Sequence, residues 1–157
     1  MGAGKSATGR ALQEQLPGLW LRWQVDDAQP KRRGVIADHL SPEEVGTAEQ
    51  RMFLANLAAI RAYLDQGWSV IAEIVVFDHQ LDMFQSAFTG LTVQVAAVTA
   101  RYDTILRRVR ADGRPRSHLS SYKAYMARLP VWADVVVATD DLSPEQAATW
   151  IREALLL

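Results

Sequence analysis

The chain has 157 residues, of which 49% are hydrophobic and 22% charged, so it can bury one core of ordinary size and leaves little for a second domain. Its formal net charge of −1 gives no reason to expect a nucleic acid or an anionic membrane as partner. The lack of cysteine excludes disulfides and thiolate metal sites, and no apolar run approaches the ~20 residues that span a bilayer. We therefore expect one cytoplasmic domain over residues 1–157.

Helical and strand patterns alternate along the chain. Apolar residues on one face predict a first helix over 7–16, which a Pro-Gly pair ends, and strand formers follow over 19–25. The Ser-Pro-Glu-Glu sequence at 41–44 and the Ser-Pro-Glu-Gln sequence at 143–146 are typical helix starts, and the first of these helices extends to about residue 66. Further strands are predicted over 70–77, 91–98 and 135–138, and further helices over 80–88, 103–111 and 119–129. The three later strands lack alternation, as strands covered on both faces do.

Residues 2–6, Gly-Ala-Gly-Lys-Ser, have the second half of the phosphate-binding loop pattern and lead directly into the first helix. Backbone N–H groups at a helix N-terminus bind phosphate, and glycine lets the chain approach it closely. In this pattern Lys5 bridges the β and γ phosphates and the Ser6 hydroxyl ligates Mg²⁺. The motif therefore predicts a site for ATP and Mg²⁺, with these nucleotide-binding residues: Gly2, Ala3, Gly4, Lys5, Ser6 and Ala7.

The loop pattern is incomplete at its start. Its first glycine would fall one position before Met1, and the buried strand that precedes such a loop is missing. With the alternating elements, the motif predicts an α/β fold, a P-loop NTPase three-layer sandwich with a parallel sheet that lacks its first strand. Because that strand would ordinarily lie at the centre of the sheet, we expect a start codon placed too far downstream rather than loss of the strand.

The chain combines the Gly-Lys-Ser helix start, a Leu-Trp-Leu strand leading to Val25 and Asp26, the long helix with an apolar strand after it, and the Arg-Tyr-Asp sequence at 101–103. Together these features resemble the chloramphenicol phosphotransferase family of P-loop kinases, over nearly the whole chain. The resemblance implies transfer of the γ-phosphate of ATP to a hydroxyl of a small molecule, with Asp26 as the base that faces this hydroxyl. A carboxylate suits the role because phosphoryl transfer needs an oriented hydroxyl more than a strong base. Asp27 is the alternative base, and a second interpretation is that both acids only cap a loop.

Glu73 interrupts the apolar run 70–77, and a carboxylate in a covered strand is costly unless it is partnered or lies at the end of the strand. In the resembled family this strand carries two consecutive acids, which implies that Glu73 holds Mg²⁺ through water. Ile74 occupies the second of these positions here. The alternative is that Glu73 marks a strand end and pairs with Lys5 or an arginine.

A basic segment follows the third predicted strand. It holds eight basic residues and two acids: Arg101, Arg107, Arg108, Arg110, Arg114, Arg116, Lys123 and Arg128, with Asp103 and Asp112. A turn-rich loop ends its first helix, which predicts a lid over the nucleotide at about residues 110–120. Arginine forks stabilise charge that spreads over a transferring phosphoryl group, and the resembled family has arginines here. Arg110 and Arg114 are therefore predicted to be catalytic with Lys5 and Asp26; the alternative is a solvated basic helix.

Two classes of function stay open. The first is an ATP-dependent kinase acting on a small-molecule hydroxyl acceptor. The second is a truncated, non-catalytic P-loop module that binds a nucleotide or a partner. Within the first class, gluconate, shikimate, adenylylsulfate and nucleoside-monophosphate kinases share the loop and the lid. Only the acceptor pocket separates them, and Trp23 is the aromatic residue that we expect to line it.

Overall fold

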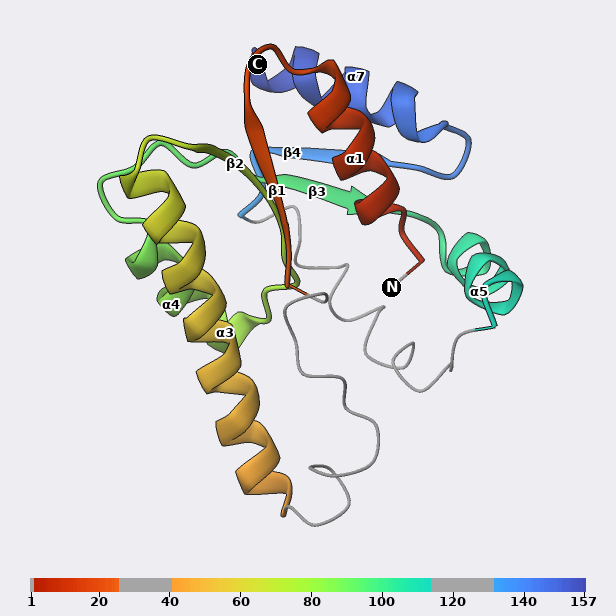
Figure 1. Ribbon diagram of the computed structural model, residues 1–157. Helices are drawn as coiled ribbons and strands as arrows, with labels where there is room; N and C mark the ends of the chain where they lie inside the picture. The colour runs from red at the N-terminus through yellow and green to blue at the C-terminus, as the bar shows by residue number, and fades with distance from the viewer. Residues whose placement is uncertain (1, 26–40, 114–131) are drawn as a thin grey trace. The chain divides into compact units, whose positions relative to one another are not determined.

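The computed structural model describes residues 2–25, 41–113 and 132–157. The chain groups into two compact units, the first made of residues 1–18 and 92–157 and the second of residues 19–91. Among the described residues, each unit has one pair of parallel strands (Figure 1). The parallel pairing predicted from the alternating pattern is confirmed, and the single domain stays a prediction. None of the helices in the described residues is long and apolar enough to cross a membrane.

The strands of the first unit are β3 (Ala96–Thr99) and β4 (Val135–Ala138). Their register places Ala96 beside Val135, so β3 begins where its partner begins and not at residue 91 as predicted. The backbone just before β3 has a side-chain partner instead, because the Val95 N–H donates to the Asp134 carboxylate at 2.6 Å. The apolar run before Val95 therefore has no partner strand within the described residues and forms no strand.

Within its described residues, the first unit has three helices: α1 (Lys5–Gln15), α5 (Tyr102–Ala111) and α7 (Pro144–Leu155). Helices α1 and α7 lie side by side (Figure 1). Their buried residues are mostly small, which permits close approach: Thr8, Gly9, Ala11 and Leu12 on α1, with Ala147, Ala148 and Ile151 on α7. The Gln15 side chain links α1 to α7, since it donates to the carbonyl of Glu145 and accepts from the hydroxyl of Thr149, both at 3.0 Å.

The second unit contains β1 (Trp20–Gln24) and β2 (Ser69–Glu73), paired in register from Trp20 with Ser69 to Gln24 with Glu73. The sequence predicts the second strand over 70–77, yet it ends at Glu73 because β1 ends at Gln24. Glu73 therefore lies at the carboxyl end of its strand. This is one of the two conditions under which a carboxylate in a covered strand is not costly.

Helix α3 (Pro42–Asp65) covers β2 and also contacts α4 (Leu81–Ala87), as Figure 1 shows. It begins with the predicted capping box, in which Ser41 accepts from the Glu44 N–H and Glu44 accepts from the Ser41 N–H. Its buried residues have helical spacing: Phe53, Asn56, Leu57 and Ile60. A single turn of 3-10 helix, η1 (Asp78–Gln80), precedes α4. The helix predicted over 119–129 lies outside the described residues.

Candidate functional site

The glycines of the predicted phosphate loop have backbone angles that other residues rarely adopt. Gly2 has φ +74° and Gly4 has φ +92°. Gly4 is the N-cap of α1 and provides no side-chain hydrogen bond, and the first turn of α1 carries no acid. The hydrogen bonding of the helix begins with the Thr8 N–H, which donates to the Gly4 carbonyl at 2.9 Å. The N–H groups before Thr8 have no helical carbonyl to bind, which is the arrangement that favours an anion.

The side chains of this turn have the chemistry that a phosphate ester and its cation require. Lys5 is half-buried, while Ser6 and Ala7 are exposed, so an amine and a hydroxyl lie at the surface beside the uncapped N–H groups. Thr8, one position further, is buried. Of the residues predicted from the motif, Ala3 is buried, and the others are exposed or half-buried at the N-terminus of α1.

The other side of the loop is packed against α5. Ala3 is buried in a cluster with Ala100, Ile105 and Val109. A Cβ atom on Gly2 would lie 3.1 Å from Cγ2 of Ile105 and 3.2 Å from Cγ2 of Val109. Gly2 is therefore required both for its φ and because a side chain has no room there.

Polar contacts also hold the inner side of the loop. Arg108 donates through Nη1 to the Gly2 carbonyl at 3.3 Å and to the Thr139 hydroxyl at 3.0 Å, and through Nη2 to the Thr139 carbonyl at 2.7 Å. The Thr139 hydroxyl lies 2.8 Å from the Ala3 carbonyl and 3.1 Å from the Thr99 carbonyl, and its single hydrogen can be donated to one of them at a time. The sequence reasoning missed both residues. Thr139 directly follows β4, and such strand ends border the binding edge of a parallel sheet.

An ion pair joins the ends of β3 and β4. The backbone N–H of Arg101 donates to Oδ1 of Asp140 at 2.9 Å, and the Arg101 Nε lies 3.2 Å from the same oxygen. Burial raises the pKa of Asp140, but hydrogen bonds from the Thr104 hydroxyl and from the backbone and guanidinium of Arg101 outweigh burial and hold this pKa below its ordinary value. Asp140 thus stays ionised at the N-terminus of α5, where the helix dipole favours a negative charge.

The remaining predicted catalytic residues have different positions. Arg110 is exposed in the last turn of α5, in the same unit as the loop. Asp26, its alternative Asp27, and Arg114 lie outside the described residues. The catalytic roles of Asp26, Arg110 and Arg114 stay predictions.

Glu73 belongs to the second unit and has protein partners on both oxygens. Arg22 Nη1 lies 2.6 Å from Oε1, and Gln24 Nε2 donates to Oε2 at 2.9 Å. The Glu73 side chain is 7% exposed and that of Arg22 is 18% exposed. Pairing with an arginine, one of the two alternatives from the sequence, is thus what the geometry shows, and the magnesium role stays a prediction. Among the described residues, no group of three or more His, Asp or Glu side chains is arranged to hold a metal.

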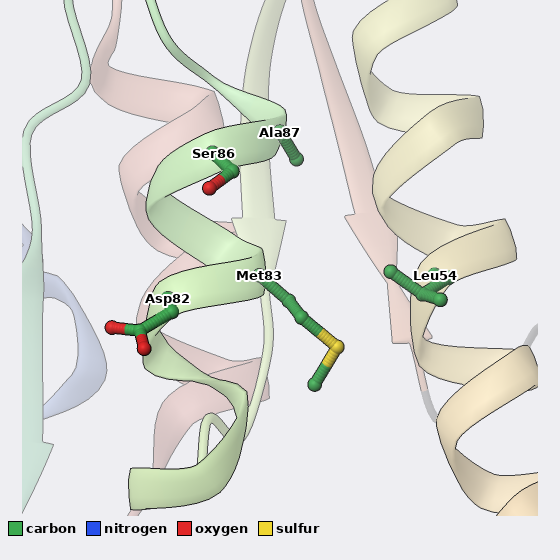
Figure 2. A pocket seen from close by; sticks show the side chains of 5 residues that line it. All are labelled: Leu54, Asp82, Met83, Ser86 and Ala87. Atoms are coloured by element: carbon green, nitrogen blue, oxygen red, sulfur yellow. The ribbon is translucent and has the colours of Figure 1, made fainter.

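The surroundings of Trp23 are those of a packed residue. Its indole Nε1 donates to Asn56 Oδ1 at 3.0 Å, and its ring centroid lies 5.8 Å from that of Tyr63. A separate open hollow lies between α3 and α4 (Figure 2), and it is lined by Leu54, Asp82, Met83, Ser86 and Ala87. None of the site residues predicted from the sequence lines this hollow.

Parallel strands, flanking helices and a Gly-Lys-Ser turn that opens a helix define an α/β protein of the P-loop kinase type. The sequence matches the family model for chloramphenicol phosphotransferase-like proteins over residues 1–156, so the chain belongs to this family. Its class is that of a kinase-type phosphotransferase. No curated protein sequence gives a significant match.

Among solved structures, the chain is similar to the tunicamycin resistance protein of Deinococcus radiodurans. The TM-score is 0.67 at 20% sequence identity, and the match covers 99% of this chain and 91% of the other. At this identity the likeness concerns the fold, and it agrees with the α/β architecture predicted from the alternating elements.

Proposed function

We propose that the chain is an ATP-dependent kinase that transfers the γ-phosphate to a hydroxyl group of a small molecule. The observation that carries the proposal is the uncapped start of α1, where the Gly2–Gly4 turn leaves N–H groups unpaired beside the Lys5 amine and the exposed Ser6 hydroxyl. Membership of a family of phosphotransferases supports the same class of reaction.

The proposed step is a direct displacement at the γ-phosphorus of ATP. The acceptor oxygen forms a bond to this phosphorus, the bond from phosphorus to the β–γ bridging oxygen breaks, and ADP leaves. The hydroxyl proton passes to the carboxylate of Asp26, and Lys5 binds the β and γ phosphate oxygens. Arg110 and Arg114 stabilise the charge that spreads over the phosphoryl oxygens.

The residues of α1 fit a Mg²⁺–nucleotide complex. Ser6 would provide a hydroxyl ligand, and we propose Glu73 as a further residue that acts through water. The cation, when bound, neutralises charge on the β and γ phosphates. Because both Glu73 oxygens have protein partners, this role requires that Arg22 or Gln24 give way.

The proposed acceptor class rests on the two compounds named in the descriptions of the family and of the similar solved structure, so both compounds are tested. The description of the family names chloramphenicol, and that of the similar solved structure names tunicamycin resistance. Both compounds carry hydroxyl groups. We propose a hydroxylated antibiotic as the acceptor class and chloramphenicol as the first member to try.

Binding is tested first, by the melting temperature of the full chain with and without Mg-ATP. A ligand at about 100 times its Kd stabilises the folded state by about 2.7 kcal/mol, which raises the melting temperature of a chain of this size by several degrees. The Lys5→Ala variant should lose this rise, while Arg10→Ala, a change at an exposed position of the same helix, should keep it. A wild-type chain that shows no rise contradicts the proposal.

Transfer is tested second, by following ³²P from γ-labelled ATP to each acceptor. Label in the acceptor, lost in Asp26→Asn, supports the kinase proposal. A chain that binds Mg-ATP but labels neither acceptor and forms no ADP in their presence would contradict the proposed acceptor class and favour the non-catalytic nucleotide-binding module.

A further inference from the structure

Thr139 and Arg108 link the phosphate loop to three other elements. Arg108 comes from α5, Thr139 follows β4, and the hydroxyl of Thr139 also reaches the last carbonyl of β3, that of Thr99. The loop contributes only its carbonyl oxygens to this network, those of Gly2 and Ala3. Thr139 is only 4% exposed, so the network is shielded from water and its hydrogen bonds are stronger than surface ones.

The direction of these carbonyls fixes the direction of the N–H groups that follow them. In a trans peptide the C=O of one residue and the N–H of the next point to opposite sides, and none of the described peptide bonds is cis. A carbonyl of Ala3 held by Thr139 therefore turns the Gly4 N–H away from Thr139. In the same way, a Gly2 carbonyl held by Arg108 turns the Ala3 N–H away from Arg108.

We propose that Arg108 and Thr139 are positioning residues for phosphate binding, an inference that rests on the proposed function. By holding two loop carbonyls on the protein side, they preset two loop N–H groups toward a bound phosphate. The loop then needs no rearrangement when the nucleotide arrives, and preorganised donors bind more tightly than donors that must first be turned.

Variants of the two residues distinguish an effect of loop position on phosphate binding from an effect of charge. Arg108 brings a positive charge near the loop as well as hydrogen bonds, so its replacement weakens phosphate binding for either reason. Thr139 carries no charge. Thr139→Val keeps the shape of the side chain and removes the hydroxyl, whereas Thr139→Ser keeps the hydroxyl.

The experiment measures the Kd of the full chain for Mg-ATP and for magnesium tripolyphosphate, by calorimetry well below each melting temperature. Tripolyphosphate has no nucleoside and reports the loop alone. Thr139→Val should weaken both ligands about tenfold, the change expected from loss of one buried hydrogen bond. Thr139→Ser should restore binding to within about threefold, and Arg107→Ala, at an exposed position on α5, should bind as the wild type. Adding Thr139→Val to Arg108→Met should raise each Kd by less than tenfold, because Arg108→Met already breaks the network that both residues share.

A purely structural role predicts a different pattern. It lowers the melting temperature of the free Thr139→Val chain and leaves both Kd values of its folded fraction unchanged, and this result overturns the inference. Equal losses in Thr139→Val and Thr139→Ser also overturn it, since the hydroxyl is then not the cause. If the wild-type chain binds neither ligand, the proposed function itself is wrong. If the wild-type chain binds and Thr139→Val binds equally well, only the positioning role is wrong.

Discussion

Arg22 and Glu73 form an ion pair between neighbouring strands, with Nη1 of the arginine 2.6 Å from Oε1 of the glutamate. Gln24 lies directly opposite Glu73 in the register, and Arg22, two residues earlier, projects from the same face of β1. Both charged side chains are largely shielded from water, at 18% and 7% exposure. Such a pair adds little by forming but costs much when one partner is removed, because the other charge is left without compensation.

Glu73→Gln should therefore lower the free energy of unfolding by about 2–3 kcal/mol, since it leaves the Arg22 guanidinium paired with a neutral amide. The quantity to measure is the midpoint of urea unfolding at neutral pH, at constant m-value.

A matched control lies on the surface of α3. Arg61 and Asp65 form an ion pair at 2.7 Å with side chains that are 37% and 50% exposed. Asp65→Asn should cost no more than about 0.5 kcal/mol, as exposed helical pairs do. If Glu73→Gln and Asp65→Asn lowered the free energy of unfolding equally, the buried pair of Arg22 and Glu73 would contribute no more to stability than an exposed pair.

Asp140 should make the stability of the chain depend on pH in the acidic range. Its pKa in the folded chain is lowered, so its contribution is fully present above the unfolded value of about 3.9 and is lost as the pH falls through the lower folded value. Asp140→Asn should cost about 1–2 kcal/mol at pH 7, because hydrogen bonds to a charged acceptor become hydrogen bonds to a neutral one. Unfolding free energies from pH 7 down to pH 2 should then fall less steeply in the variant. An identical slope in both proteins would exclude Asp140 as a source of this dependence.

The sequence predicted the order and type of the described elements because local signals define them. The capping boxes at Ser41 and Ser143 mark helix starts within a few residues, and both are present as predicted. Strand ends were less well predicted: β2 stops at Glu73 and β3 starts at Ala96 because their partners, β1 and β4, set these limits. Pairing partners are distant in sequence, so an apolar run alone does not show where pairing stops.

The sequence predicted the phosphate loop but not the residues that hold its carbonyl groups, Arg108 and Thr139. The signal for Arg108 was present, since it lies four residues after Thr104 and three after Ile105, both buried, and so shares their helical face. Arg107 and Arg110 are exposed. Choosing among these arginines requires the rotation of α5, which its apolar residues define. Glu73 could be foreseen as a paired acid, but Arg22 as its partner depends on the register of β1 and β2.

The cap of α7 should contribute measurably to stability. The Ser143 hydroxyl accepts from the Gln146 N–H at 3.2 Å and donates to Glu145 at 2.7 Å, a bond that lowers the pKa of Glu145. Ser143→Ala should cost about 1 kcal/mol, the usual loss for an N-cap. Thermal unfolding can be compared with that of Ser86→Ala, a change at an exposed position in α4 that should be neutral within about 0.5 kcal/mol. Similar losses in the two variants would mean that the cap contributes nothing specific.

Alanine substitutions at three glycines should have three different outcomes. Gly2→Ala should be the most harmful, at about 3 kcal/mol, because φ is +74° and the new Cβ would lie 3.1 Å from Ile105 Cγ2. Gly4→Ala meets only ordinary contacts, the nearest at 3.5 Å to Thr139 Oγ1, so its cost should be that of φ +92° alone, about 1–2 kcal/mol. Gly46, within α3, has open space around it, and Gly46→Ala should stabilise the chain by about 0.5–1 kcal/mol.

Urea unfolding of the three glycine variants gives this ranking directly, and the sign at Gly46 serves as the internal control. If Gly2→Ala cost no more than Gly4→Ala, the loop would not be packed against α5 as closely as the Ile105 contact indicates. Mg-ATP binding separates the two loop positions further. Gly4→Ala places a methyl group against Thr139 and Arg108, the two residues that hold the loop carbonyls, so its Kd for Mg-ATP should rise by more than its modest loss of stability implies.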